Sequence, residues 1–201
     1  MKNKNKSLKL KPKYWFLCEW ETEKCYFSIW NNKFKKEKIS VEIKCIWQVS
    51  GINKYKIENI RKKINYNNNQ LKKTWSKVFV LLDIDWYKRN SYSTENINFI
   101  KKNLENDNIK VLFSNKNFEL WILLHLKNFD KENWDYINEI QKYNETYKKW
   151  KNNCNVQFFT KILDKDLNTA IERAEKLEKK YENKLNLKDK IPYTEIYKIF
   201  N

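Results

Sequence analysis

The chain has 201 residues, enough for one domain with a full hydrophobic core, or for one domain with a helical appendage. Its 42 Lys and Arg residues against 25 Asp and Glu residues give a formal charge of +17, which favours a polyanionic partner such as nucleic acid. No apolar run reaches the roughly 18 residues that a membrane helix needs, and the Lys- and Asn-rich start lacks the apolar segment of a signal peptide, so we expect a cytoplasmic protein.

Up to residue 127, strand-like and helix-like segments alternate along the chain. The strand-like segments are short apolar or alternating runs at residues 13–19, 39–47, 78–85 and 109–113. The helix-like segments cover residues 22–36, 54–64, 94–106 and 117–126. This order predicts an α/β fold with a roughly four-stranded parallel sheet, right-handed crossovers and helices on both faces.

Beyond residue 127 the pattern changes to helices and loops. Residues 135–150 and 168–185 form charged helical segments, and residues 193–200 have the length of a last turn or two. A narrow apolar stripe on the second segment either packs on its own domain or serves a partner, and consists of Ile171, Ala174, Leu177, Tyr181 and Leu185. We therefore expect an α/β core over residues 1–127 and a helical C-terminal extension over residues 128–201 that packs on it.

The cysteines argue against a zinc site. Cys18, Cys25, Cys45 and Cys154 form no C-x-x-C pair, and His125 is the only histidine. Reduced and mostly buried thiols are the default for a cytoplasmic protein.

Two aspartates follow the most apolar strand. Asp83 and Asp85 are two residues apart at the carboxyl end of the segment 78–85, so their side chains point to the same side. Two carboxylates held this close repel each other unless a cation lies between them, and a hard ion such as Mg²⁺ is the usual solution. Ligands of open α/β sheets bind at this edge. The alternative is a solvated strand end with two ordinary acids.

The first strand also ends in carboxylates. Glu19 follows the apolar run directly, and Glu23 falls in the first turn of the next helix. Parallel strands bring these acids to the same sheet edge as Asp83 and Asp85. Glu23 has a plain alternative, because an acid in a first helical turn favours the helix dipole.

Four segments together resemble a known family. The acids Glu19, Asp83 and Asp85 on successive strands are similar to those of the Toprim domain, which topoisomerases, primases and a class of nucleases share. The closer resemblance is to the RloB-like (AbiLii-type) Toprim proteins of bacterial defence systems. It rests on residues 18–27 (CEWETEKCYF), 83–85 (DID), 114–125 (SNKNFELWILLH) and 170–174 (AIERA), which occur in the family's order and span nearly the whole chain.

The resemblance implies a Toprim-like Rossmannoid fold and a Mg²⁺-dependent nuclease that cleaves DNA or RNA, with Mn²⁺ as a possible substitute for Mg²⁺. In such a nuclease Asp83 and Asp85 hold the metal, and Glu19 helps to bind it or moves a proton at the scissile phosphate. Glu23 and Glu119 are further candidate metal ligands. The family also implies an ABC-type ATPase as partner protein and a role in anti-phage defence by abortive infection.

Several residues near this edge are candidates for contact with nucleic acid. Lys88 and Arg89 follow the aspartates and either contact the phosphate backbone or belong to a solvated loop. Ser114 and Asn115 follow the fourth strand and either contact a phosphate or cap the next helix.

The polar residues of segment 117–126 have two interpretations each. Glu119 either caps neighbouring amides or faces the acidic site, because burial of an unpartnered charge is costly. His125 lies four residues after Trp121, and a hydrogen-bonded core histidine is the favoured interpretation.

One position departs from the family pattern. The family has glycine after the first glutamate, whereas this chain has Trp20, which cannot freely adopt positive φ or let a phosphate approach the backbone closely. The indole either weakens activity, packs in the core or stacks on a base, with Trp86 as a second stacking candidate. A catalytically inactive Toprim protein that binds nucleic acid or regulates its ATPase partner is therefore the alternative function. A ribonuclease of RNA maturation is the third.

Overall fold

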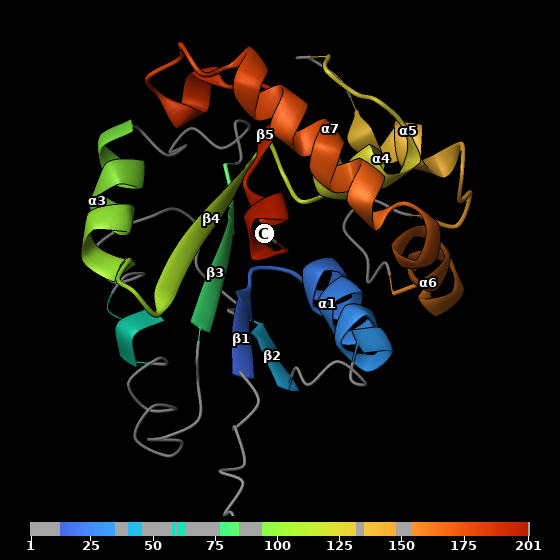
Figure 1. The fold of residues 1–201 in the computed structure, drawn as a ribbon, viewed down its shortest axis with the longest axis horizontal. Coiled ribbons are helices and arrows are strands. Elements are labelled where there is room, and N and C mark those ends of the chain that lie inside the picture. Colours follow the sequence, from blue (N-terminus) through green and yellow to red (C-terminus); the bar gives the residue numbers. More distant parts are fainter. Residues whose placement is uncertain are drawn as a thin grey trace, which may run out of the picture.

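A computed structural model of the chain (Figure 1) describes residues 13–34, 40–45, 58, 60–62, 77–84, 94–131, 135–147 and 154–200. The strands are β1 (Lys13–Cys18), β2 (Ser40–Cys45), β3 (Lys77–Asp83), β4 (Ile109–Asn115) and β5 (Tyr193–Thr194). The α-helices are α1 (Glu21–Phe34), α3 (Thr94–Leu104), α4 (Glu119–Leu126), α5 (Tyr136–Gln141), α6 (Val156–Lys165) and α7 (Leu167–Lys180). Two short 3-10 helices are η2 (Leu187–Asp189) and η3 (Ile196–Ile199). Across the described ranges, no helix combines the length and apolar character that a membrane crossing requires.

The strands form one sheet in the order β2-β1-β3-β4-β5. The first four are parallel, which confirms the predicted parallel sheet, and β5 runs antiparallel to β4. The register pairs Leu17 with Val80 and Asp83 with Ser114, so the carboxyl ends of β1, β3 and β4 lie along one edge. This edge holds most of the predicted site residues.

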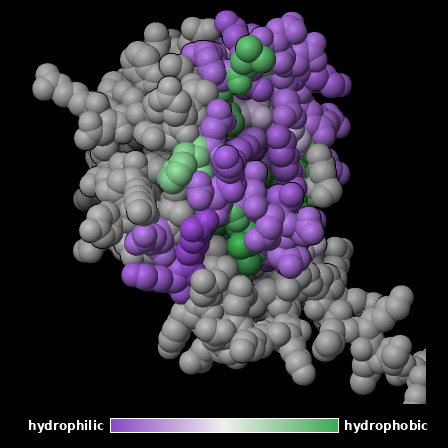
Figure 2. All heavy atoms as spheres, turned by 90° about the vertical axis from the view of Figure 1, so that its left-hand side faces the viewer, coloured by the Kyte–Doolittle hydropathy of each residue, from purple (hydrophilic) through white to green (hydrophobic). Residues whose placement is uncertain are grey.

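Helices cover both faces of the sheet, as predicted. Side chains alternate along β1, so that Phe16 belongs to the hydrophobic cluster with α1, α4, α6 and α7, while Trp15 belongs to the cluster with α3. Figure 1 shows α3 on one side of the sheet and α1, α4, α5, α6 and α7 on the opposite side. Figure 2 shows the α3 side, where hydrophilic side chains cover most of the described surface and hydrophobic ones are scattered. Both faces of the sheet are thus buried, which explains why its central strands are almost wholly apolar.

The C-terminal extension packs into the same core. Ala170 and Ala174 are fully buried on α7, where their small side chains let α7 lie close to α4. Between them, Arg173 Nη1 donates to the carbonyl oxygens of Leu124, at 2.6 Å, and His125, at 3.2 Å, at the C-terminal end of α4. The segment AIERA, which lies within α7, therefore holds α7 against α4. In the predicted stripe, Ala174, Leu177 and Tyr181 are buried and Ile171 is partly buried, whereas Leu185 is exposed.

Three details of the extension differ from the sequence prediction. α5 ends at Gln141, well before residue 150, although Asp135 caps its start by accepting from the backbone N–H of Ile137 and Asn138. α6 was not predicted at all. β5 was not predicted either, since two residues carry no periodic signal, although residues 196–199 do form the expected short turn.

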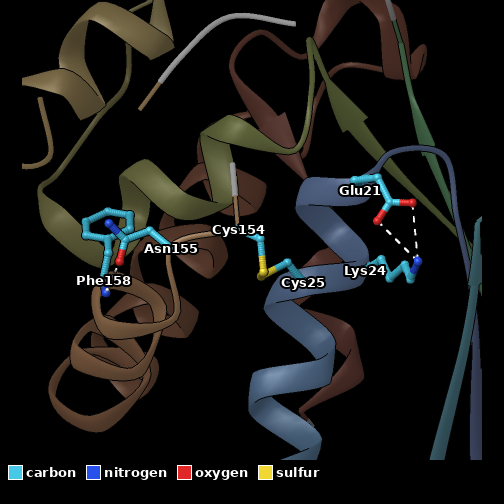
Figure 3. The surroundings of a disulfide bond; sticks show 6 residues. All are labelled: Glu21, Lys24, Cys25, Cys154, Asn155 and Phe158. Carbon is cyan, nitrogen blue, oxygen red and sulfur yellow. Dashed lines mark hydrogen bonds and ion pairs between the residues drawn. A yellow bond between two sulfur atoms is a disulfide. The ribbon is translucent and has the colours of Figure 1, made fainter. Parts of the chain in front are cut away.

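Cys25 and Cys154 form a disulfide, contrary to the expectation of reduced thiols (Figure 3). The two residues are 129 positions apart, and the packing of α1 against α6 brings their Cα atoms to 5.4 Å, within the range that a disulfide requires. Cysteine spacing along the chain could not reveal this pair, because tertiary packing creates it. Cys18 is buried, as expected.

Candidate active site

Glu19 and Asp83 meet at the carboxyl edge of the sheet. Asp83 is the last residue of β3, and Glu19 directly follows β1, its parallel neighbour. The backbone N–H of Asp83 donates to Glu19 Oε2 at 3.1 Å. Asp83 is buried and continues the alternation of Phe79 and Leu81, whose side chains pack on the face that α1 and α4 cover. The structure thus brings together the acids of two separate motifs.

Glu23 closes the turn between β1 and α1. Its Oε2 accepts hydrogen bonds from the backbone N–H of Glu19, at 2.6 Å, and of Trp20, at 3.0 Å. These N–H groups precede the helix and have no intrahelical acceptor, so a carboxylate four residues later satisfies them. This geometry agrees with the alternative that the sequence left open, an acid that serves the start of a helix. It also fixes the position of Glu19.

The carboxylates of this edge affect one another. Burial raises the pKa of the Glu23 carboxyl well above its ordinary value of 4.5. The nearby negative charges of Glu19 and Glu119 also raise this pKa, while the hydrogen bonds from the Trp20 and Glu19 N–H groups lower it. Acids from the end of β1, from α1 and from α4 therefore share one electrostatic environment. A bound cation or a proton would relieve their repulsion.

Glu119 reaches this environment from the start of α4. Its charge acts on Glu23, and the hydroxyl of Tyr147 donates to its Oε1 at 3.4 Å, a long hydrogen bond. Whether Glu119 caps neighbouring amides or serves the acidic site stays a prediction. Tyr147 was not predicted as a site residue, because it lies 28 positions away from Glu119 in a segment without a motif.

Ser114 and Asn115 are both buried beneath the C-terminal segment. The hydroxyl of Ser114 lies 2.9 Å from that of Thr194 in β5. The Asn115 side-chain nitrogen donates to the carbonyl oxygens of Leu187, at 3.2 Å, and Lys190, at 2.9 Å. These contacts hold the chain end against the sheet, so a contact with phosphate would require that segment to move. That role stays a prediction.

Trp20 lies at the surface of the same turn. Its N–H donates to Glu23 and its carbonyl accepts from the N–H of Lys24 at 3.3 Å, while 39% of the residue is exposed. This exposure contradicts the core alternative and leaves stacking on a base open. The predicted residues Asp85, Trp86, Lys88 and Arg89 lie outside the described residues.

Tyr26 and His125 form a buried polar pair between α1 and α4. The Tyr26 hydroxyl lies 2.9 Å from His125 Nε2, and burial lowers the pKa of His125 to about 3. The positive charge of Arg173 acts in the same direction. His125 is thus the hydrogen-bonded core histidine that the sequence favoured. Its partner Tyr26 belongs to the first motif, so this contact links two motif segments.

The donor set suits a hard cation only in part. Glu19 and Asp83 offer carboxylate oxygens, the ligands that Mg²⁺ prefers. Within the part of the chain that the structure describes, no three metal-ligating side chains converge closely enough to complete a site. Asp85, the third predicted carboxylate, lies outside the described residues.

The mostly parallel sheet, its helices on both faces and the helical C-terminal part define an α/β protein with a Rossmann-like fold. A family model described as RloB-like protein matches residues 14–201, so the chain belongs to the RloB-like family. This membership indicates a defence-associated domain. No curated protein and no solved structure matches the chain.

Proposed function

We propose that this protein is a metal-dependent nuclease that cleaves phosphodiester bonds of DNA or RNA as the effector of an abortive-infection system. The observation that carries the proposal is the convergence of Glu19 and Asp83 at the sheet edge, within an electrostatic environment shared with Glu23 and Glu119. Membership in the RloB-like family and the charge of +17 support it.

Glu19, Asp83 and Asp85 would hold Mg²⁺, for which Mn²⁺ can substitute. Bound there, the ion would neutralise charge on the phosphoryl oxygens and lower the pKa of an attacking water. Carboxylate repulsion at this edge gives the protein a physical reason to bind a cation.

The remaining residues position these acids and the nucleic acid. Glu23 fixes the turn that presents Glu19, whose Oε2 is anchored to the Asp83 backbone. The second carboxylate oxygen of Glu19 would contact the ion or accept a proton at the phosphate. Lysines, Lys88 among them, would draw in the polyanion, and the exposed Trp20 would stack on a base.

The partner in this proposal is an ABC-type ATPase, which the family resemblance implies. Such a partner could hold the nuclease inactive until a phage signal arrives. The second candidate function, an inactive Toprim protein that regulates this ATPase, is favoured by Trp20 at the family's glycine position.

A cleavage assay tests the proposal. Purified protein with Mg²⁺ or Mn²⁺ is incubated with plasmid, single-stranded DNA, transfer RNA and total RNA, with and without the ATPase. We expect cleavage that chelation abolishes and that Glu19→Gln and Asp83→Asn reduce by at least about a hundredfold, the order that a catalytic acid or base contributes. Glu21→Gln is the matched control, because Glu21 lies in the same turn but pairs with Lys24 at 3.2 Å.

Each outcome discriminates between the two functions. Cleavage that survives chelation would exclude the metal mechanism. An absence of cleavage on every substrate, in both the presence and the absence of the ATPase, would favour the inactive protein, and restored cleavage in Trp20→Gly would identify the indole as the cause.

A further inference from the structure

A polar pocket lies beside the acidic edge, where the turns after α5 meet the start of α6. It has a volume of about 370 Å³, within the range of small-molecule sites. Most of its lining consists of uncharged hydrogen-bonding side chains, namely those of Asn144, Thr146, Tyr147, Asn155 and Gln157. Cys154 and Val156 complete the lining, and no charged side chain is among the described residues that form it.

Two links fix this pocket relative to the acids. On one side, the hydroxyl of Tyr147 donates to Glu119 Oε1 at 3.4 Å. On the other side, Cys154 is bonded to Cys25, two residues after Glu23 on α1 (Figure 3). The pocket is thus attached to α4 and to α1, the two helices that carry acids to the edge.

The carboxamides of the pocket have hydrogen-bonding capacity to spare. Asn144 Oδ1 accepts from the Thr146 hydroxyl at 2.8 Å, whereas its buried Nδ2 has no hydrogen-bond partner among the described residues. The side-chain oxygen of Asn155 caps α6 by accepting from the N–H of Phe158 at 2.9 Å. Gln157, in the first turn of α6, is exposed. A buried donor without a partner is costly, so a ligand acceptor at Asn144 would stabilise the site.

We propose that this pocket binds one nucleobase of a DNA or RNA strand whose backbone lies at the acidic edge; this proposal rests on the proposed function. Carboxamides offer a donor and an acceptor side by side, which matches the paired groups on base edges. The pocket includes the start of α6, but Asn155 already accepts from the Phe158 N–H there, and no cationic side chain is among the described lining residues, so the site suits a base better than a phosphate. The pocket would therefore confer base preference, while the acids and the lysines handle the backbone.

Binding measured without cleavage tests this assignment. The probes are short fluorescent single-stranded oligonucleotides of adenine, cytosine and thymine or uracil, a guanine-containing repeat, and an abasic strand of equal length, in DNA and RNA forms. A chelator in the buffer prevents cleavage. We expect the protein to prefer one base by about tenfold or more, the order that one bidentate base contact supplies. Comparison of the DNA and RNA forms of each probe shows which of the two nucleic acids the pocket prefers.

Two variants and a control locate the preference. Gln157→Ala changes an exposed side chain, and Asn144→Asp keeps the acceptor for Thr146 while it removes the buried donor. We expect each to reduce the preference to about threefold or less, whereas Asn183→Ala, at an exposed position outside the pocket, leaves it unchanged. Thermal melting verifies that each variant is folded.

The results separate this proposal from the nuclease function. Equal affinity for all bases, an abasic strand that binds as tightly as the others, or an unchanged preference in both variants would overturn the pocket assignment even if cleavage is observed. A preference that the variants remove supports the assignment. Loss of cleavage in Glu19→Gln with retained base preference shows that the two sites act separately.

Discussion

Replacement of Cys154 by serine should lower the free energy of unfolding by up to about 5 kcal/mol under oxidising conditions. The disulfide joins residues 129 positions apart, so it restricts the unfolded chain strongly. The entropy of closing a loop of this size corresponds to about 5 kcal/mol, which is an upper value, because measured disulfides contribute between about 0 and 5 kcal/mol. Cys154 is exposed, so the serine itself should cost little packing, whereas Cys25 is buried and stays in place.

Urea unfolding of four samples measures this effect. Wild type and Cys154→Ser are each unfolded with and without a thiol reductant. An m-value of about 2–3 kcal/mol per M converts the full effect into a shift of about 2 M in the urea midpoint. We expect unreduced wild type to have the highest urea midpoint, while reduced wild type and both variant samples share a lower one.

Three results would refute this reasoning. Four free thiols in unreduced wild type, counted from the intact mass after thiol labelling, would show that the crosslink is not formed. Wild type with a verified disulfide could unfold at the same urea concentration after reduction, and the loop-entropy argument would then be wrong. A variant less stable than reduced wild type would instead assign the effect to packing of the Cys154 side chain.

Two further predictions concern the acidic edge. The folded-state pKa of Glu23 lies above its ordinary value of 4.5. The protonated carboxyl therefore makes its full contribution to the free energy of unfolding below about pH 4.5, and this contribution is lost as the pH rises through the folded-state pKa. Glu23→Gln keeps an acceptor for the N–H groups and should flatten the dependence of unfolding free energy on pH, measured by urea unfolding across the range; a profile as steep as that of wild type would contradict this. Asp83→Asn should keep or raise the metal-free melting temperature and reduce the gain from Mn²⁺, which for wild type is about 2.7 kcal/mol at a hundredfold excess over Kd. Asp83 would instead be a structural residue if Mn²⁺ stabilised Asp83→Asn as much as wild type, or if the variant without metal melted at a much lower temperature than wild type.

The sequence predicted those parts of the fold that depend on local pattern. β1, β3 and β4 are apolar runs bounded by polar residues, and their alternation with helices implies a parallel sheet whatever the tertiary details. β5 and the Cys25–Cys154 disulfide depend on contacts between distant segments, which no local pattern records. α6 is different, because its buried residues Phe158, Phe159, Ile162 and Leu163 have helical spacing and Asn155 caps it. That signal was present in the sequence and was missed.

The same division applies to the candidate site. Glu19 and Asp83 could be placed together from sequence, because the carboxyl ends of neighbouring parallel strands share one edge. The partners of Ser114 could not, since Thr194 is 80 positions away and belongs to a strand that the sequence does not reveal. Tyr147 was missed for the same reason, because its contact with Glu119 depends on how α5 and the turns after it pack on α4.

The turn at Trp20 bears directly on the choice between nuclease and inactive protein. A glycine at this position would matter if the turn needed a backbone that only glycine adopts. Here the N–H groups of Glu19 and Trp20 both donate to Glu23, and Glu19 still accepts from the backbone of Asp83. These hydrogen bonds are made with tryptophan in place, and the partly exposed indole stands at the surface of the turn. What the substitution changes is the space in front of the turn, so its effect should fall on how nucleic acid approaches, rather than on the arrangement of the acids themselves.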